Sequence, residues 1–206
     1  MNLKLIEDSG ECVTLEELKA HLRIDFHDQD ALLNMSISAA RVFIEEYLNR
    51  SLLNKTFELW LNSDELGALS AKDWAGVRHG SIAEIAGNST INLRTGKVQQ
   101  IVHVKSYGQG NDELDFDSSN YFLDEVSEPG RIVLNYGATW PTDLRYINAL
   151  KIRFKAGYGT SPSSVPAPLL NAVKFLAAHF YDEGCDDCNV PKSVFMLLNP
   201  YRIFVM

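Results

Sequence analysis

The spacing of the hydrophobic residues changes twice along the chain, and each change separates two kinds of secondary structure. In residues 13–49 and 164–198, hydrophobic side chains recur every three or four positions, which is typical of amphipathic helices. Between them, residues 56–159 contain short runs of alternating hydrophobic and polar residues, separated by turns rich in glycine, proline and asparagine. The sequence therefore predicts an α+β fold, with a helical core of two N-terminal and two C-terminal helices and a large inserted antiparallel β-rich lobe.

The same pattern predicts how the chain is divided. Residues 1–55 and 164–206 are expected to form the helical core, and residues 56–160 the inserted lobe, within a single domain that spans residues 1–206. Residues 62–88 have weaker patterning and contain several glycines, so we interpret them as a long excursion from the lobe.

The helix expected near residue 14 has the clearest start signal in the sequence. Thr14 can cap it by accepting a hydrogen bond from the backbone of Glu17, whose side chain can return a bond to the backbone of Thr14. Val13 and Leu18 occupy the two positions of a hydrophobic staple, which packs across this first turn. These residues predict where a helix begins and indicate no particular chemistry.

The next helix, expected over residues 28–49 with Asp28 as a suitable cap, is hydrophobic over more than half of its circumference. Its hydrophobic positions form two adjacent rows: Leu33, Ile37, Ala40, Ile44 and Leu48 in one, and Leu32, Met35, Ala39 and Phe43 in the other. A surface helix normally buries one stripe, so this helix needs cover on two sides. Either it lies at the centre of the monomer or it also packs against another subunit.

The C-terminal part of the chain begins with prolines and ends in a hydrophobic tail. Pro166 and Pro168 suit the first turn of a helix, where a missing backbone N–H leaves no hydrogen bond unmade. The helix-spaced row that follows consists of Leu169, Val173, Leu176 and Phe180 and predicts a core helix. A short helix over residues 191–198 and a strand-like tail over residues 201–206 complete the expected order.

The charge of the chain argues against tight binding of nucleic acid. Nineteen basic and 27 acidic side chains give a net charge of −8, and no run of Lys or Arg provides the basic surface that gripping phosphates requires. No stretch approaches the roughly 18 consecutive apolar residues of a membrane-spanning helix, and the first residues lack the pattern of a secretory signal. Three cysteines without such a signal favour a reducing compartment. We therefore expect a protein that is made in the cytosol and does not contact membranes.

One pair of cysteines has the spacing of a metal site. Cys185 and Cys188 are separated by two residues, as in zinc sites, and His179 lies six residues before the first of them. A structural zinc site needs four ligands, and only Cys12 and scattered histidines remain to complete the set. The chain also lacks the nucleophile-elbow, metalloprotease and phosphate-loop signatures. We therefore expect no enzyme and no cofactor, with zinc binding as an alternative.

Nine short segments form an ordered set across nearly the whole chain: residues 13–23, the acidic patch 28–30, the helix around residues 39–41, and residues 129–132, 140–141, 156–159, 165–169, 177–181 and 197–202. In this order they resemble the head–tail connector, or adaptor, proteins of tailed bacteriophages and prophages. The resemblance implies a non-enzymatic connector domain that forms a ring, usually of twelve copies, beneath the portal after DNA packaging. Such a ring extends the DNA channel toward the tail.

The resemblance also implies partners, and the patterns above suggest two contact regions. The ring-interface residues expected on the helix over residues 28–49 are Met35, Ala39, Arg41 and Phe43. The residues expected to dock on the portal or neck are Tyr201, Arg202, Ile203 and Phe204, because a strand-like tail can add to a partner's sheet edge. Further partners would be other copies of the chain and a tail-side neck or stopper protein. DNA would pass through without specific binding, since an acidic ring repels its backbone.

The resemblance places the protein in the host cytoplasm during assembly and then in the neck of the virion. Two alternatives stay open. One is a tail-completion or stopper-type interaction protein, and the other is a small zinc-binding protein that uses Cys185 and Cys188.

Overall fold

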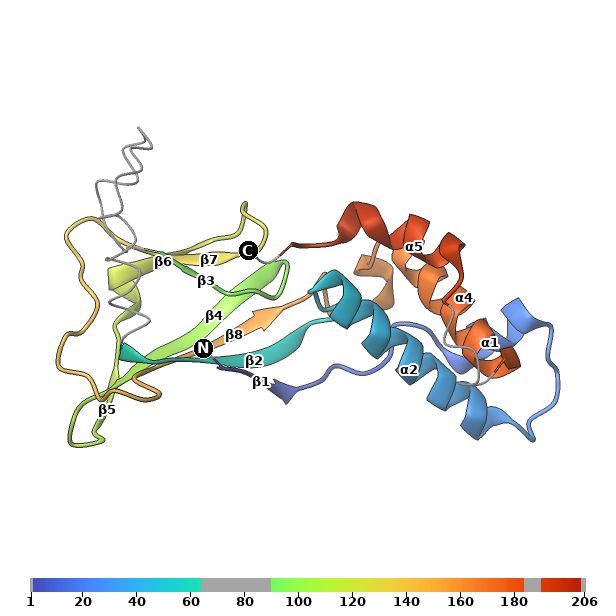
Figure 1. Ribbon diagram of the computed structural model, residues 1–206, viewed down its shortest axis with the longest axis horizontal. Helices are drawn as coiled ribbons and strands as arrows, with labels where there is room; N and C mark the ends of the chain where they lie inside the picture. Colours follow the sequence, from blue (N-terminus) through green and yellow to red (C-terminus); the bar gives the residue numbers. More distant parts are fainter. Residues whose placement is uncertain (1, 64–89, 184–189, 205–206) are drawn as a thin grey trace. The chain divides into compact units, whose positions relative to one another are not determined.

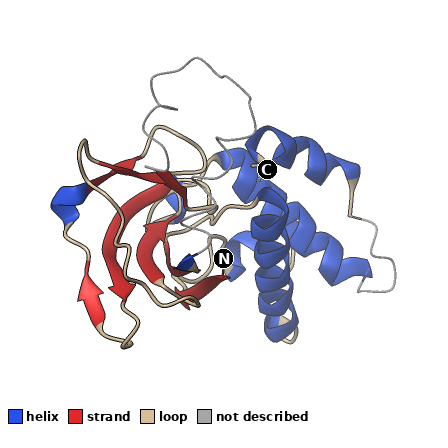
Figure 2. Cartoon of the chain, turned by 60° about the vertical axis from the view of Figure 1, so that its left-hand side comes forward, coloured by secondary structure: helices blue, strands red, loops and turns tan. Residues whose placement is uncertain are grey.

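The computed structural model describes residues 2–63, 90–183 and 190–204, and its elements are labelled in Figure 1. The chain forms two compact units. The β unit consists of Met1–Asp8 and Lys55–Ala156, and the helical unit consists of Ser9–Asn54 and Gly157–Met206. Figure 2 shows the helices and strands of the chain. The α+β class predicted from the sequence is confirmed.

The described part of the helical unit contains the helices α1 (Leu15–Leu22), α2 (Asp30–Leu48), α4 (Ala167–Glu183) and α5 (Lys192–Leu198). Single 3-10 turns at Pro162–Ser164 and Asn199–Tyr201 precede α4 and follow α5. The predicted capping box of α1 is confirmed, because Glu17 N donates to Thr14 Oγ1 at 3.2 Å and Thr14 N donates to Glu17 Oε2 at 3.4 Å.

The start of α2 differs from the sequence prediction. The sequence favours Asp28 as the cap, but the helix begins at Asp30 and follows Gln29, whose side chain makes no capping hydrogen bond. Asp30 lies in the first turn and forms an ion pair with Lys19 of α1. A carboxylate in this position is favourable because it lies near the positive end of the helix dipole.

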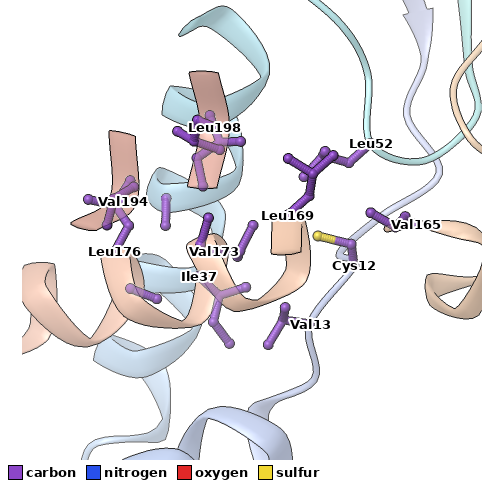
Figure 3. Close-up of a cluster of buried hydrophobic side chains, with 14 of the residues drawn as sticks. Cys12, Val13, Ile37, Leu52, Val165, Leu169, Val173, Leu176, Val194 and Leu198 are labelled. Carbon is purple, nitrogen blue, oxygen red and sulfur yellow. The ribbon is translucent and has the colours of Figure 1, made fainter. Parts of the chain in front are cut away.

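Side chains from all of these helices form the core of the helical unit, part of which is shown in Figure 3. The predicted row of α2, Leu33, Ile37, Ala40, Ile44 and Leu48, is at most 1% exposed. In this core α2 packs against α4, which contributes Leu169, Val173 and Leu176. Removing most of a buried leucine side chain from such a core costs about 2–5 kcal/mol of folding free energy. The core is therefore the main source of stability in this unit.

The described part of the β unit contains two antiparallel sheets. The five-stranded sheet has the order β1 (Asn2–Glu7), β2 (Lys55–Leu61), β8 (Leu150–Ala156), β4 (Val98–Tyr107) and β5 (Glu113–Asp115). The three-stranded sheet has the order β3 (Thr90–Asn92), β7 (Arg131–Leu134) and β6 (Tyr121–Asp124).

The five-stranded sheet has one apolar and one polar face. On β8, Leu150, Ile152, Phe154 and Ala156 alternate with Lys151, Arg153 and Lys155. The first set is buried in a core that also includes Ile91 and Ile132 from the three-stranded sheet. We call the side that carries this first set the inner face and the opposite, charged side the outer face. This alternation is expected for a sheet that is covered on one side.

Two features of the chain path were not evident from the sequence. The sequence groups residues 1–55 with the helical core, but Asn2–Glu7 form β1 and pair with β2 in the β unit. Gly157 has φ +148°, and a Cβ atom there would lie 2.4 Å from the carbonyl oxygen of Leu53. Only glycine fits this close approach of two backbone segments. Most of the excursion expected over residues 62–88 lies outside the described residues.

Candidate assembly surfaces

One side of α2 exposes hydrophobic side chains to solvent. Leu32 is 46% exposed, Met35 69% and Val42 43%, and Ala39 is also exposed. Their spacing of three, four and three residues places them on one side of the helix. We call these four residues the α2 stripe. A row of exposed hydrophobic side chains on a helix that already buries another row is typical of a protein contact surface.

Arg41 lies on α2 but not on the α2 stripe. Its side chain is buried, with Nε donating to Glu11 Oε2 at 2.9 Å and Nη1 donating to Glu45 Oε2 at 3.1 Å. Ser38 Oγ donates to Glu11 Oε1 at 2.8 Å, and Glu45 Oε1 accepts from the backbone N–H of Leu52 at 3.0 Å. Arg41 therefore helps to hold the segments before α1 and after α2 against α2.

The four predicted ring-interface residues thus have different environments. Met35 and Ala39 are exposed on the α2 stripe, whereas Phe43 is half-buried and packs against the helical core. Arg41 is buried in the ion network described above. Of these four residues, Met35 and Ala39 are the two whose side chains are exposed, and the interface itself stays a prediction.

The C-terminal tail is attached to the end of α2. Ile203 is 5% exposed, its N–H donates to Leu48 O at 3.0 Å, and its carbonyl accepts from Asn49 Nδ2 at 2.9 Å. The Arg202 guanidinium lies 4.4 Å from the ring centroid of Tyr47 and 5.1 Å from that of Phe204. Phe204 itself is 70% exposed.

The tail residues predicted to dock therefore divide into anchors and an exposed end. Tyr201 and Ile203 pack on the helical unit, and the Arg202 guanidinium makes cation–π contacts with the rings of Tyr47 and Phe204. Phe204 is the predicted residue that exposes most of its side chain. Residues 205–206 lie outside the described part, and docking of the tail stays a prediction.

The outer face of the five-stranded sheet holds an aromatic and charged cluster. Trp60 and Tyr107 stack with centroids 5.7 Å apart, and Lys151 Nζ lies 5.3 and 5.4 Å from their centroids. Tyr107 Oη donates to Glu113 Oε2 at 2.6 Å, and Lys151 and Lys105 form ion pairs with Glu113. Hydrogen bonds from Lys105 and Tyr107 lower the pKa of Glu113 to about 2. The cluster ties β5 to β4 and β8.

The cysteines do not form a described metal site. Cys12 is buried in the helical core (Figure 3), and its burial, together with the negative charge of Glu11, raises the pKa of the thiol to about 12. Cys185 and Cys188 lie outside the described residues. Within residues 2–63, 90–183 and 190–204, no three His, Cys, Asp or Glu side chains are grouped so that they could hold a metal ion. None of the described helices is long and apolar enough to cross a membrane.

The sequence reasoning missed two residues that matter here. Glu11 binds Arg41 across 30 positions of sequence, and no local pattern links them. Val42 extends the α2 stripe by one turn, and its spacing of three from Ala39 could have revealed it. Glu11 could be recognised as the partner of Arg41 only once the fold was known.

The comparisons with known proteins agree with the resemblance seen in the sequence. Residues 12–107 match the model of the family described as phage gp6-like head-tail connector protein. Over these residues the chain is similar to the head–tail connector proteins. The recognition made from the sequence is thereby confirmed. None of the curated proteins compared with the chain matches it.

Solved structures share the fold over the full length of the chain. One, "Virion of native gene transfer agent (GTA) particle", is 22% identical with a TM-score of 0.74. Two others are 23% identical: "Neck of empty GTA particle computed with C6 symmetry", with a TM-score of 0.74, and "Neck of native GTA particle computed with C12 symmetry", with 0.72. Each match covers 100% of this chain and 98% of the other. At this identity the likeness shows a common fold.

Proposed function

We propose that this chain is a structural protein of the phage neck, which assembles as a ring under the portal, connects the head to the tail and extends the DNA channel. The match of residues 12–107 to the head–tail connector family carries this proposal. The matched residues include α1, α2 and the strands from β2 to β4, and so parts of both units. Both units would act together as one connector domain.

A ring of twelve copies is the proposed assembly. The similar solved structures include gene transfer agent necks computed with C6 and C12 symmetry, which supports a ring for this chain. In a ring, each copy contacts the next through two different surfaces. The α2 stripe supplies one such surface, because fully burying an exposed Leu, Met or Val side chain is worth about 1.5–3 kcal/mol. We place Met35 and Ala39 at the centre of this contact.

The portal contact is proposed at the C-terminal tail. Phe204 exposes an aromatic side chain, while Arg202 and Ile203 fix the preceding residues on the helical unit. A partner can therefore bind Phe204 without displacing the tail. Adding all of residues 201–204 to a partner's sheet would first require breaking the hydrogen bond from Ile203 N to Leu48 O. A tail-side neck or stopper protein would occupy the opposite end of the ring.

The remaining parts of the proposal follow from the connector role. The protein would have a structural and not a catalytic function, and it would move from the host cytoplasm into the virion neck. The net charge of −8 would let DNA pass without specific binding, because like charge repels the phosphate backbone.

Native mass spectrometry over a range of protein concentrations tests the ring. We expect the wild-type chain to form a ring of about twelve copies without bound metal. Met35→Asp should lower the ring fraction, because it places a charge in the buried centre of the contact. Met196→Asp is the matched control, since Met196 is 76% exposed on α5 and outside the α2 stripe. Equal assembly of both variants would contradict the placement of the contact on the α2 stripe.

Binding to the purified portal distinguishes the remaining candidates. The proposed function predicts a complex with the portal that weakens in Phe204→Ala. A monomer that ignores the portal and binds a tail protein would instead support the tail-completion or stopper function. A monomer that contains zinc would support the alternative based on Cys185 and Cys188.

A further inference from the structure

The five-stranded sheet of the β unit ends in β1 on one side and β5 on the other (Figure 1). Each of these strands is hydrogen-bonded to a single neighbour, β2 for β1 and β4 for β5, among the residues that the structure describes. A strand at the end of a sheet presents backbone N–H and C=O groups that can pair with a strand of another chain. Both ends of this sheet are therefore potential contact surfaces.

The backbone of β5 has groups that point away from β4. Asp112 O accepts from Gly108 N at 3.1 Å, Leu114 O accepts from Ser106 Oγ at 3.3 Å, and Phe116 N donates to Val104 O at 2.9 Å. The backbone groups at 112, 114 and 116 thus face β4. Since these groups alternate in direction along a strand, those of Glu113 and Asp115 face outward.

The hydrophobic side chains at the two ends lie on the same face of the sheet. Leu3 pairs with Leu59, and Leu114 pairs with Ser106, whose partner is Leu150. Leu59 and Leu150 both belong to the inner core, so Leu3, Leu5 and Leu114 all lie on the inner face. They are 45%, 46% and 60% exposed, respectively. Each end of the sheet therefore carries hydrophobic side chains that its own core covers only in part.

Both ends of the sheet also carry charged side chains on the outer face. Those at the β1 end and those at the β5 end have opposite signs. Lys4 pairs with Glu58 across β1 and β2, and Asp115 pairs with Lys105 across β4 and β5. Lys4 is exposed, and the side chain of Asp115 is 79% exposed. If the two ends met, Lys4 would lie on the same face as the acidic residues of β5. The ends thus match in hydrophobicity on one face and in charge on the other.

The inner face at the β5 end is also hollowed. An open pocket of about 380 Å³ is lined by Leu114, Pro141 and Leu144 and by polar residues that include Ser106, Asp112 and Asp143. A hydrophobic side chain from a strand that extended the sheet beyond β5 would lie on this same face, next to Leu114. The pocket therefore leaves room beside Leu114 for Leu3 or Leu5 of another copy.

We propose that β5 of one copy pairs with β1 of the next copy, so that the sheet continues from chain to chain around the ring. Four successive antiparallel steps separate β1 from β5, so the two strands run in the same direction. If the ring axis runs along the strands, rotation from one copy to the next preserves the strand direction. The pair formed by β5 of one copy and β1 of the next is then parallel. The contact joins two different ends and is therefore of the head-to-tail kind that closes into a ring. This inference rests on the ring assembly proposed above.

A charge exchange tests the pairing. Lys4→Glu and Asp115→Lys should each raise the concentration needed for half-assembly at least tenfold, because each creates like charges at the contact. The double variant should recover most of the assembly, since it restores opposite charges in exchanged positions. Val126→Lys is the control, because Val126 is 95% exposed in the same unit and lies outside the five-stranded sheet. Circular dichroism would verify that every variant is folded.

Crosslinking locates the contact directly. The protein is assembled from equal parts of ¹⁴N- and ¹⁵N-labelled chains and treated with a carbodiimide, which joins amines to carboxylates. We expect mixed-isotope peptides that link Lys4 to Asp115 or Glu113, both in the purified ring and in isolated particles. Rings that form without this crosslink, and with unchanged assembly of both single variants, would contradict the strand pairing and leave the connector function standing. If the chain assembled neither in solution nor in particles, both the strand pairing and the proposed connector function would be contradicted.

Discussion

One ion network of the helical unit and one ion pair of the β unit differ in how far water reaches them. In the helical unit, the side chain of Arg41 is 8% exposed and bridges Glu11 and Glu45. In the β unit, Arg131 pairs with Asp124 at 2.7 Å, but its side chain is 44% exposed. Water screens the second pair far more than the first. The comparison indicates that Arg41 contributes to the folding of the helical unit, whereas Arg131 contributes little to the folding of the β unit.

Arg41→Ala should have the largest effect on stability. Removing this guanidinium leaves two carboxylates side by side without their cation, and breaking a buried ion pair typically costs about 3–5 kcal/mol. Arg131→Ala is the matched control and should change the free energy of unfolding only slightly. Urea denaturation followed by circular dichroism measures both. Equal losses in the two variants would remove the distinction between the two ion pairs.

Gly157→Ala should have the next largest effect, and it extends the comparison to the backbone. A methyl group at this position would collide with the carbonyl of Leu53, so we expect a loss of about 3 kcal/mol. Gly137 in the β unit also has a positive φ, +80°, but a Cβ atom added there would meet no other atom within 4 Å. Gly137→Ala should therefore lose only about 1 kcal/mol, from backbone strain alone. Thermal unfolding of the two variants tests this order.

Much of the fold could be predicted from the sequence because its signals are local. The capping box of Thr14 and Glu17, the buried row of α2 and the alternation along β8 each depend on residues a few positions apart. The strand β1 was missed because a short strand at the end of a chain can be recognised only from the strand with which it pairs. Its partner β2 begins at Lys55, far along the sequence. The fold class could be predicted, but the unit to which the first residues belong could not.

The candidate surfaces were predicted less completely, for a related reason. Helical spacing identified Met35 and Ala39 but could not show that Arg41, two residues later, turns inward to Glu11. The hydrophobic character of the tail predicted docking on a partner, which stays a prediction, but it could not show that the backbone of Ile203 is hydrogen-bonded to Leu48 and Asn49 of its own chain. The sequence indicates that a side chain will be in contact with another group. Only the fold shows whether that group belongs to the same chain or to another protein.

Acid should weaken the β unit through Glu113. Its pKa is about 2 in the folded chain and 4.5 ordinarily, because Lys105, Tyr107 and Lys151 bind the ionised form. A lowered pKa means that this stabilisation is complete above pH 4.5 and is lost as the pH falls toward 2. Glu113→Gln should reduce the pH dependence of thermal unfolding in this window, and Glu125→Gln serves as the control. An unchanged slope in Glu113→Gln would show that the cluster does not stabilise the folded state.

The smallest effect concerns the reactivity of Cys12, which reports how firmly the helical unit is closed. The thiolate is the reactive form, and a pKa of about 12 in place of 9.0 leaves about a thousandfold less of it at pH 8. We expect iodoacetamide to modify the Cys12 peptide in urea but hardly at all in the native chain, as followed by mass spectrometry. Arg41→Ala should accelerate the native reaction, because Arg41 holds Glu11, the residue before Cys12, against α2. If native labelling is already fast, the segment before α1 opens without global unfolding, and the ion network of Arg41 does not hold this segment closed.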